Sequence, residues 1–179
     1  MGTTERGGPE VSFVSCQVAQ SPMDTCSAPD RPEDQLVSLR DVTKDNVRDV
    51  IALEVAQEQS SYVATNAKSI AEAHFETKAW FRAIGAGDDL VGFAMVYRDP
   101  TAGIFYIWRF MIDARHQGQG YGRRAMELLL DEARADGARE ITLSVVPGEH
   151  SALDFYRRLG FEETGKIEHG ELELGLSLT

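Results

Sequence analysis

The sequence predicts a single α/β domain with a mixed β-sheet flanked by helices. Segments with the alternating apolar spacing of strands are separated by stretches with helical apolar spacing, and a glycine-rich segment joins a strand to a helix. The chain has 179 residues, of which 42% are hydrophobic, which suits one globular domain with its own core.

The N-terminal residues differ in composition from the rest and are predicted to form a disordered tail over 1–35, followed by the domain at 36–179. Residues 21–35 hold three prolines and few large apolar side chains, too little apolar surface to offset the entropy lost on ordering. Two basic and six acidic residues give the tail a charge of −4, so the domain alone carries −7 of the chain's −11.

The first part of the domain is predicted to contain a strand and two helices. The strand covers 36–42, and Thr43 is predicted to cap the first helix. The apolar face of that helix carries Val47, Val50, Ile51, Leu53 and Val55. Ser69 and Glu72 have the capping-box spacing, which predicts a second helix that runs to about Thr77.

Three strands, a long helix and a closing group of elements complete the predicted domain. The strands are expected at 79–86, 90–98 and 104–112. The glycine-rich segment 117–122 opens a helix that ends near Gly137. The remaining elements are a strand at 141–146, a short helix at 151–159 that ends before Gly160, and strands at 161–167 and 171–178.

Composition argues against several classes of protein. A net charge of −11 disfavours nucleic acid as a partner, because phosphate binding needs a basic surface. No stretch approaches the about 18 apolar residues of a membrane helix, and no basic-then-apolar leader is present, so we expect no membrane and a cytoplasmic location. The two cysteines, Cys16 and Cys26, lie in the tail, and nothing around them predicts a metal site.

The glycine-rich segment is the first candidate for a ligand site. It reads Gln-Gly-Gln-Gly-Tyr-Gly-Arg over 117–123 and lies where a strand leads into a helix. Free backbone N–H groups and the helix dipole favour a phosphate there, and Arg123 and Arg124 at the helix start suit an anion. The spacing matches neither GxxxxGK[ST] nor GxGxxG. A tight turn without a ligand explains the glycines equally well.

Two motifs together resemble the GNAT superfamily of N-acetyltransferases. FMIDARHQGQGYGRRAMELLLDEA (110–133) resembles its acetyl-CoA motif, with Gln117, Gly120 and Gly122 at the Q/R-x-x-G-x-G/A positions. ALDFYRRLGF (152–161) resembles the second signature, and the likeness covers the chain from about Leu36 onward. The resemblance implies a mostly antiparallel sheet splayed around acetyl-CoA as co-substrate, and direct acetyl transfer to an amine.

The resemblance also implies residue roles. The loop that would hold the pyrophosphate comprises Gln117, Gly118, Gln119, Gly120, Gly122 and Arg123. Phe110 and Ile112 would contact the pantetheine arm, and the Ile112 N–H would polarise the thioester carbonyl as a single oxyanion donor. Tyr156 would be the general acid that protonates the departing thiolate, although packing is its alternative role. The absence of cysteine from the domain fits transfer without an acyl-enzyme.

One position departs from the family pattern. Glu149 stands where the family commonly has an asparagine that contacts the cofactor. We therefore consider Glu149 as a group that positions or deprotonates the amine. Asp113, His116 and His150 are alternative bases.

The acceptor is expected to be a small amine. Residues 55–73 and 108–113 resemble the diamine and spermine/spermidine branch of the superfamily. Glu54 and Glu58, predicted to share one helical face, suit a polycation, although a solvated face explains them as well. Tyr62 and Trp108, together with Trp80 and Tyr97, are candidates for cation–π contacts with an ammonium.

Other readings stay open at this point. Within enzymes, the alternatives are an acetyltransferase of an aminoglycoside-like drug or of a protein N-terminus. From another class, the alternative is a non-catalytic acyl-CoA-binding sensor. The resemblance also allows a homodimer.

Overall fold

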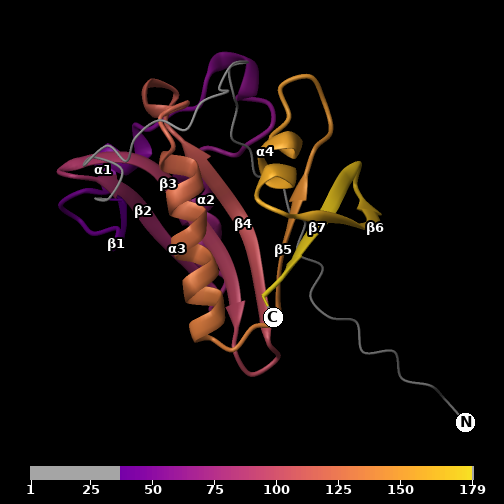
Figure 1. Cartoon of the computed structure of the whole chain (residues 1–179). Coiled ribbons are helices and arrows are strands. Elements are labelled where there is room, and N and C mark those ends of the chain that lie inside the picture. The colour runs from indigo at the N-terminus through magenta and orange to yellow at the C-terminus, as the bar shows by residue number, and fades with distance from the viewer. Residues whose placement is uncertain (1–36, 179) are drawn as a thin grey trace, which may run out of the picture.

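The computed structural model describes residues 37–178, so the predicted tail lies outside the described residues, together with Leu36 and Thr179. The described chain folds into a seven-stranded sheet with helices on both faces (Figure 1). The strands are β1 Val37–Arg40, β2 Ala79–Ala86, β3 Asp89–Asp99, β4 Ile104–Ile112, β5 Glu140–Val145, β6 Glu162–Glu168 and β7 Glu171–Ser177. The helices are α1 Val47–Ile51, α2 Asn66–Ala73, α3 Tyr121–Ala135 and α4 Leu153–Arg158, with the 3₁₀ turns η2 Gln57–Gln59 and η3 Ala114–His116. No helix within 37–178 is long and apolar enough to cross a membrane.

The sheet is mixed and mostly antiparallel, which confirms the predicted fold class. Its strand order is β1-β2-β3-β4-β5-β7-β6, and only β4 and β5 run parallel. A parallel pair needs a crossover connection, and the long helix α3 supplies it.

The parallel pair parts after two residues. β4 pairs with β5 only at Tyr106 with Thr142 and at Ile107 with Leu143. The rest of β4, from Trp108 to Ile112, continues beside β3, and β4 and β5 diverge toward the end of the sheet where α4 lies (Figure 1). We call Trp108–Ile112 the open edge of β4, and it is the splay that the resemblance implies.

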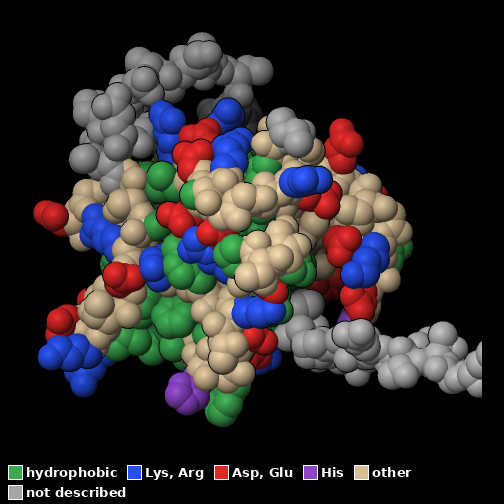
Figure 2. Space-filling model, turned by 90° about the horizontal axis from the view of Figure 1, so that it is seen from below, with side chains coloured by type: hydrophobic (Ala, Val, Ile, Leu, Met, Phe, Trp, Pro, Cys, Tyr) green, Lys and Arg blue, Asp and Glu red, His purple; other side chains and the backbone are tan. Residues whose placement is uncertain are grey.

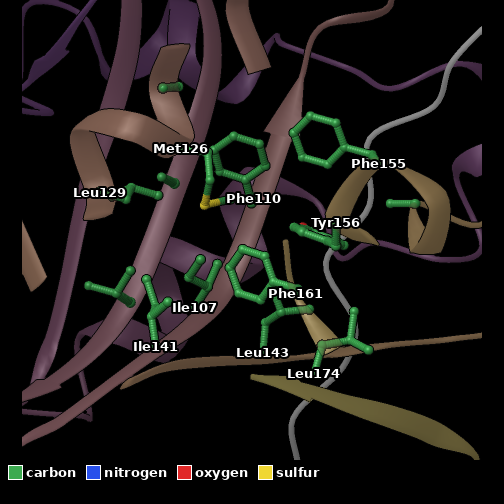
Figure 3. Close-up of a cluster of buried hydrophobic side chains, with 14 of the residues drawn as sticks. Ile107, Phe110, Met126, Leu129, Ile141, Leu143, Phe155, Tyr156, Phe161 and Leu174 are labelled. Atoms are coloured by element: carbon green, nitrogen blue, oxygen red, sulfur yellow. The ribbon is translucent and has the colours of Figure 1, made fainter. Parts of the chain in front are cut away.

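Apolar side chains pack on both faces of the sheet. On one face α3 and α4 cover a large cluster that includes Phe110, Met126 and Phe155 (Figure 3). On the other face α1 and α2 cover a smaller cluster that includes Val50 and Phe93. Each large buried side chain contributes about 1.5–3 kcal/mol. The two faces therefore hold the sheet between helices as the sequence predicts.

A β-bulge places two successive residues of β4 on the same side of the sheet. The register shifts between Met95 and Val96 of β3, opposite the Ile107–Arg109 step of β4. Trp108 packs in the α1/α2 cluster, as Tyr106 does, and Arg109, which is 1% exposed, donates to Glu72 of α2 at 3.0 Å. The carboxylate of Glu72 thereby offsets a buried guanidinium.

Two helix predictions were wrong in their bounds. α1 ends at Ile51, so Leu53 and Val55 follow it in a loop, although Leu53 is still buried. α2 begins at Asn66 because the Thr65 hydroxyl accepts the Lys68 N–H at 3.3 Å, four residues before the predicted start. Ser69 is buried inside the helix and donates to the Thr65 carbonyl. Glu72 is occupied by Arg109 rather than by a capping box.

Charged residues tie the sheet to the end of α3. Arg98 of β3 donates to both carboxylate oxygens of Asp136 at 2.6 Å and stacks on Trp80 at 4.8 Å. Arg82 stacks on the same ring at 4.3 Å, so two guanidinium groups of the protein itself contact Trp80. Acidic and basic side chains are interspersed on the face seen in Figure 2, which looks up at this end of the molecule.

The outer edge of the sheet is strand β6. All of its residues are exposed, including Ile167, and its pairing with β7 is interrupted between Glu163 and Ile167. Four of its seven residues carry a charge, namely Glu162, Glu163, Lys166 and Glu168.

The ion pair of Lys78 and Asp99 should make a contribution to the free energy of unfolding that is lost in acid. Asp99 accepts from Lys78 and from the Thr101 hydroxyl, which lowers its pKa from 3.8 to about 2. Because the folded-state pKa is the lower one, the stabilisation is complete above pH 4 and is lost as the pH falls toward 2. Asp99→Asn should therefore lower the free energy of unfolding at pH 6 and have progressively less effect between pH 4 and 2. Urea titrations across this range measure it, and a difference that does not depend on pH would contradict it.

Candidate functional site

The glycine-rich loop joins β4 to α3 and presents an uncapped helix N-terminus. Gly118 and Gly120 have φ angles of 73° and 87°, a left-handed conformation that side chains resist. No side chain caps α3, and its first turn holds no acidic residue. Its first N–H groups and the helix dipole are therefore suited to an anion such as the pyrophosphate of acetyl-CoA. Arg123 lies exposed beside them and pairs with Glu127 at 3.1 Å.

Gly122 marks where three elements meet under this loop. A Cβ built at Gly122 would lie 3.5 Å from Ile112 Cγ1 and 3.5 Å from Phe155 Cζ, which is ordinary van der Waals contact. Phe155 in turn stacks on Phe110, with ring centroids 6.3 Å apart (Figure 3). The position thus accepts glycine or alanine and excludes larger side chains.

The open edge of β4 supplies backbone groups next to the loop. The Asp113 N–H donates to the Val91 carbonyl of the preceding strand at 2.9 Å. Because backbone groups alternate sides along a strand, the N–H groups of Phe110 and Ile112 face away from β3 and toward the diverging β5. The two residues predicted to meet the pantetheine arm are therefore brought together on that edge. Loop and edge together fit acetyl-CoA.

Gln117 is held by its side chain inside the protein. Its Nε2 donates to the Ile112 carbonyl at 3.0 Å and to Gln59 Oε1 at 3.0 Å. A role toward the cofactor is therefore left to its backbone. Gln59 is completely buried in η2, and the sequence analysis did not identify it. A lone glutamine in a polar stretch carries no periodic or motif signal that could have found it.

Residues 53–65 form a segment that runs past the end of β4 toward the β5–α4 loop. The Glu54 N–H donates to Asp113 Oδ2 at 3.1 Å, and the Ala114 N–H donates to the Glu54 carbonyl at 2.8 Å. At the other end, the Tyr62 hydroxyl lies against Gly148, where an added Cβ would come within 2.5 Å of it. The 53–65 segment therefore connects both sides of the splay.

The prediction that Glu54 and Glu58 share one face of a helix was wrong. Glu54 lies in the loop after α1, and Glu58 lies in the separate turn η2, so the two do not share a helix. Both residues are exposed, as is Glu149 on the β5–α4 loop beside Gly148. The contact of Tyr62 with Gly148 brings the 53–65 segment and the loop of Glu149 together.

Asp113 is a structural group rather than a free base. Burial alone would raise its pKa, but hydrogen bonds from the Arg115 side chain and from the Glu54 and Arg115 N–H groups lower the pKa below 3.8. Both oxygens are engaged, and the carboxylate holds the start of the 53–65 segment. A group held ionised in this way is a poor proton acceptor near neutral pH.

Two predicted aromatic site residues are buried. Trp108 is 5% exposed and packs in the α1/α2 cluster, on the face that Tyr106 also occupies, and its contact with a substrate stays a prediction. Tyr156 is fully buried between Phe155 and Phe161, at centroid distances of 5.2 and 5.6 Å (Figure 3). Its packing role is real, and its role as the acid stays a prediction.

This combination of a splayed parallel pair with an uncapped, glycine-led helix defines the class of protein. The chain matches the acetyltransferase (GNAT) family over residues 45–161, and it belongs to that family. It is thus an acetyl-CoA-dependent N-acetyltransferase.

The chain is also similar to individual acetyltransferases. The chain is 29% identical over 141 residues to the spermine/spermidine N(1)-acetyltransferase of Bacillus subtilis (strain 168), covering 74% of this chain and 91% of that protein. Its fold is similar to a spermidine N-acetyltransferase SpeG chimera from Vibrio cholerae and hSSAT, with a TM-score of 0.62, 17% identity, and coverage of 80% of this chain and 96% of that one. It is also similar to PaiA N-acetyltransferase from Thermoplasma acidophilum in complex with coenzyme A, with a TM-score of 0.62, 13% identity, and coverage of 79% and 98%.

The loop geometry predicts opposite outcomes for two neighbouring glycines. Gly120→Asp should abolish acetyl-CoA binding, because a carboxylate would meet the pyrophosphate at a left-handed backbone position. Gly122→Ala should bind normally, because its Cβ has room at 3.5 Å. Calorimetric titration of both variants with acetyl-CoA measures this. Equal affinity for the two would remove the loop from the cofactor site.

The buried phenol of Tyr156 predicts a separable loss of catalysis. Tyr156→Phe keeps the ring contacts with Phe155 and Phe161 and removes only the hydroxyl. If the hydroxyl is the acid, kcat should fall ~10²-fold or more with little change in melting temperature. Turnover of the variant at the wild-type rate would leave Tyr156 with packing alone.

Proposed function

We propose that the acceptor is a polyamine such as spermine or spermidine, acetylated on a primary amino group. The observation that carries the proposal is the set of exposed carboxylates on the two connected sides of the splay, Glu54 and Glu58 on the 53–65 segment and Glu149 on the facing loop. Exposed carboxylates on both sides of the splay suit a chain of several ammonium groups. The name of the Bacillus subtilis relative supports the same substrate class.

The charge of the whole domain also favours a polyamine as the acceptor. Its net charge of −7 attracts polycations, while the face in Figure 2 mixes both signs and offers no competing acidic patch. An aminoglycoside-like drug and a protein N-terminus are the competing acceptors. A sensor that binds acyl-CoA without turnover is the competing class.

The reaction that this site would support is a direct transfer. Acetyl-CoA supplies the acetyl group as a thioester. The amine nitrogen would bond to the carbonyl carbon as the carbon–sulfur bond breaks, and the Ile112 N–H would donate to the carbonyl oxygen. The Tyr156 hydroxyl would give its proton to the departing sulfur, and the proton lost by the amine would pass to solvent through Glu149.

Glu149 is the preferred group for the amine side of the reaction. It is exposed on the loop that Tyr62 contacts, whereas Asp113 is held ionised by its own hydrogen bonds. Glu149 would then hold the ammonium and accept its proton through water. A cytoplasmic location and a homodimer stay predictions.

Steady-state kinetics with a panel of amines test the proposed acceptor. At saturating acetyl-CoA, kcat/KM for spermine and spermidine should exceed that for a monoamine and should fall as salt rises, because screening shortens the reach of the carboxylates to about 8 Å. Glu54→Gln combined with Glu58→Gln should raise KM for spermine more than for the monoamine.

The matched control changes the same charge elsewhere. Glu140→Gln combined with Glu162→Gln, at the first residues of β5 and β6, removes two exposed carboxylates and should leave the spermine KM unchanged. The proposed acceptor is wrong if polyamines are no better than monoamines, or if an aminoglycoside is preferred by ~10-fold or more. Binding of acetyl-CoA without turnover of any amine would favour the sensor.

A further inference from the structure

The amide of Gln59 joins three parts of the site that are far apart in the sequence. Its Oε1 accepts from the Ala56 N–H at 3.1 Å and from Gln117 Nε2 at 3.0 Å. The Nε2 of Gln117 also donates to the Ile112 carbonyl at 3.0 Å. The network therefore runs from the 53–65 segment to the first residue of the cofactor loop and on to the open edge of β4.

The orientation of both amides follows from their partners. The Ala56 N–H can only donate, so the Gln59 atom that faces it must be the oxygen. The Ile112 carbonyl can only accept, so the Gln117 atom that faces it must be the nitrogen. A flip of either amide would oppose two donors or two acceptors, and the network has a single satisfied arrangement.

The buried amide of Gln59 has a local role and a long-range one. Gln59 is completely buried, and its Nε2 has no hydrogen-bond partner among residues 37–178, which carries a desolvation cost. Its Oε1 accepts two hydrogen bonds, and the one from the Ala56 N–H closes the turn η2. The other comes from Gln117, the first residue of the cofactor loop, and capping of η2 does not account for it.

We propose that Gln59 is a positioning residue that couples the amine-side segment to the acetyl-CoA site. By holding Gln117, it fixes the entry of the cofactor loop and the Ile112 carbonyl at the end of the open edge. The inference rests on the acetyl transfer of the family and on no particular amine, so it stands or falls separately from the polyamine proposal. Although Gln59 lies in the 53–65 segment, removal of its amide should first weaken the binding of coenzyme A.

The test compares two glutamines of the same turn. Gln59→Met keeps the length of the side chain and removes the amide, and it should weaken coenzyme A binding ~10-fold in calorimetry and raise the KM for acetyl-CoA. Gln57→Met makes the same chemical change at an exposed position of η2, and its coenzyme A affinity should equal that of the wild type.

Further variants separate positioning from packing. Gln59→Glu keeps an oxygen for both hydrogen bonds and should restore coenzyme A affinity relative to Gln59→Met. The Gln59→Met and Gln117→Met changes combined should be no worse than the more harmful single change, because both break the same contact. If Gln59→Met does not fold, the comparison of Gln59→Glu with Gln117→Met gives the same readout. A lower melting temperature with wild-type coenzyme A affinity, or no rescue by glutamate, would overturn the proposal.

Discussion

The early parting of β4 from β5 is the constraint on which the rest of the structure depends. Two parallel residue pairs hold the strands together, and beyond them β4 continues in the sheet with β3 while β5 diverges. The side of β4 that faces the diverging β5 is suited to a ligand that carries amides of its own. The loop that follows β4 then delivers a helix N-terminus at the same end of the sheet.

The 53–65 segment compensates for this interruption of the sheet. It is bound to the end of β4 through Glu54 and Asp113, to the cofactor loop through Gln59 and Gln117, and to the far side through Tyr62 and Gly148. Each attachment uses a different kind of contact, from an ionised carboxylate to a close backbone approach. The same segment therefore bridges the end of β4 and the β5–α4 loop, which are the two sides of the splay.

Local patterns predicted most of this fold, and long-range contacts account for the differences. All seven strands follow the expected order, and the glycine loop and α3 lie where their spacing indicates. The shared side of Trp108 and Arg109 was not predicted, because a bulge opposite Met95 shifts the alternation of β4 and no sequence period reveals a bulge. The start of α2 was misplaced because two capping signals compete and Thr65, the earlier one, prevails. Gln59 could not be found, because its partner lies 58 residues away.

The exposed strand β6 affects how the polypeptide behaves before it is fully folded. An edge strand is a template onto which a strand of another chain can add, and the risk is greatest while sheets are still incomplete. Here the pairing of β6 with β7 is interrupted between Glu163 and Ile167, and three glutamates with one lysine leave the strand with a net negative charge, so a second copy of it is an unfavourable neighbour. The outermost strand thus disfavours the self-association of newly made chains at cellular concentrations.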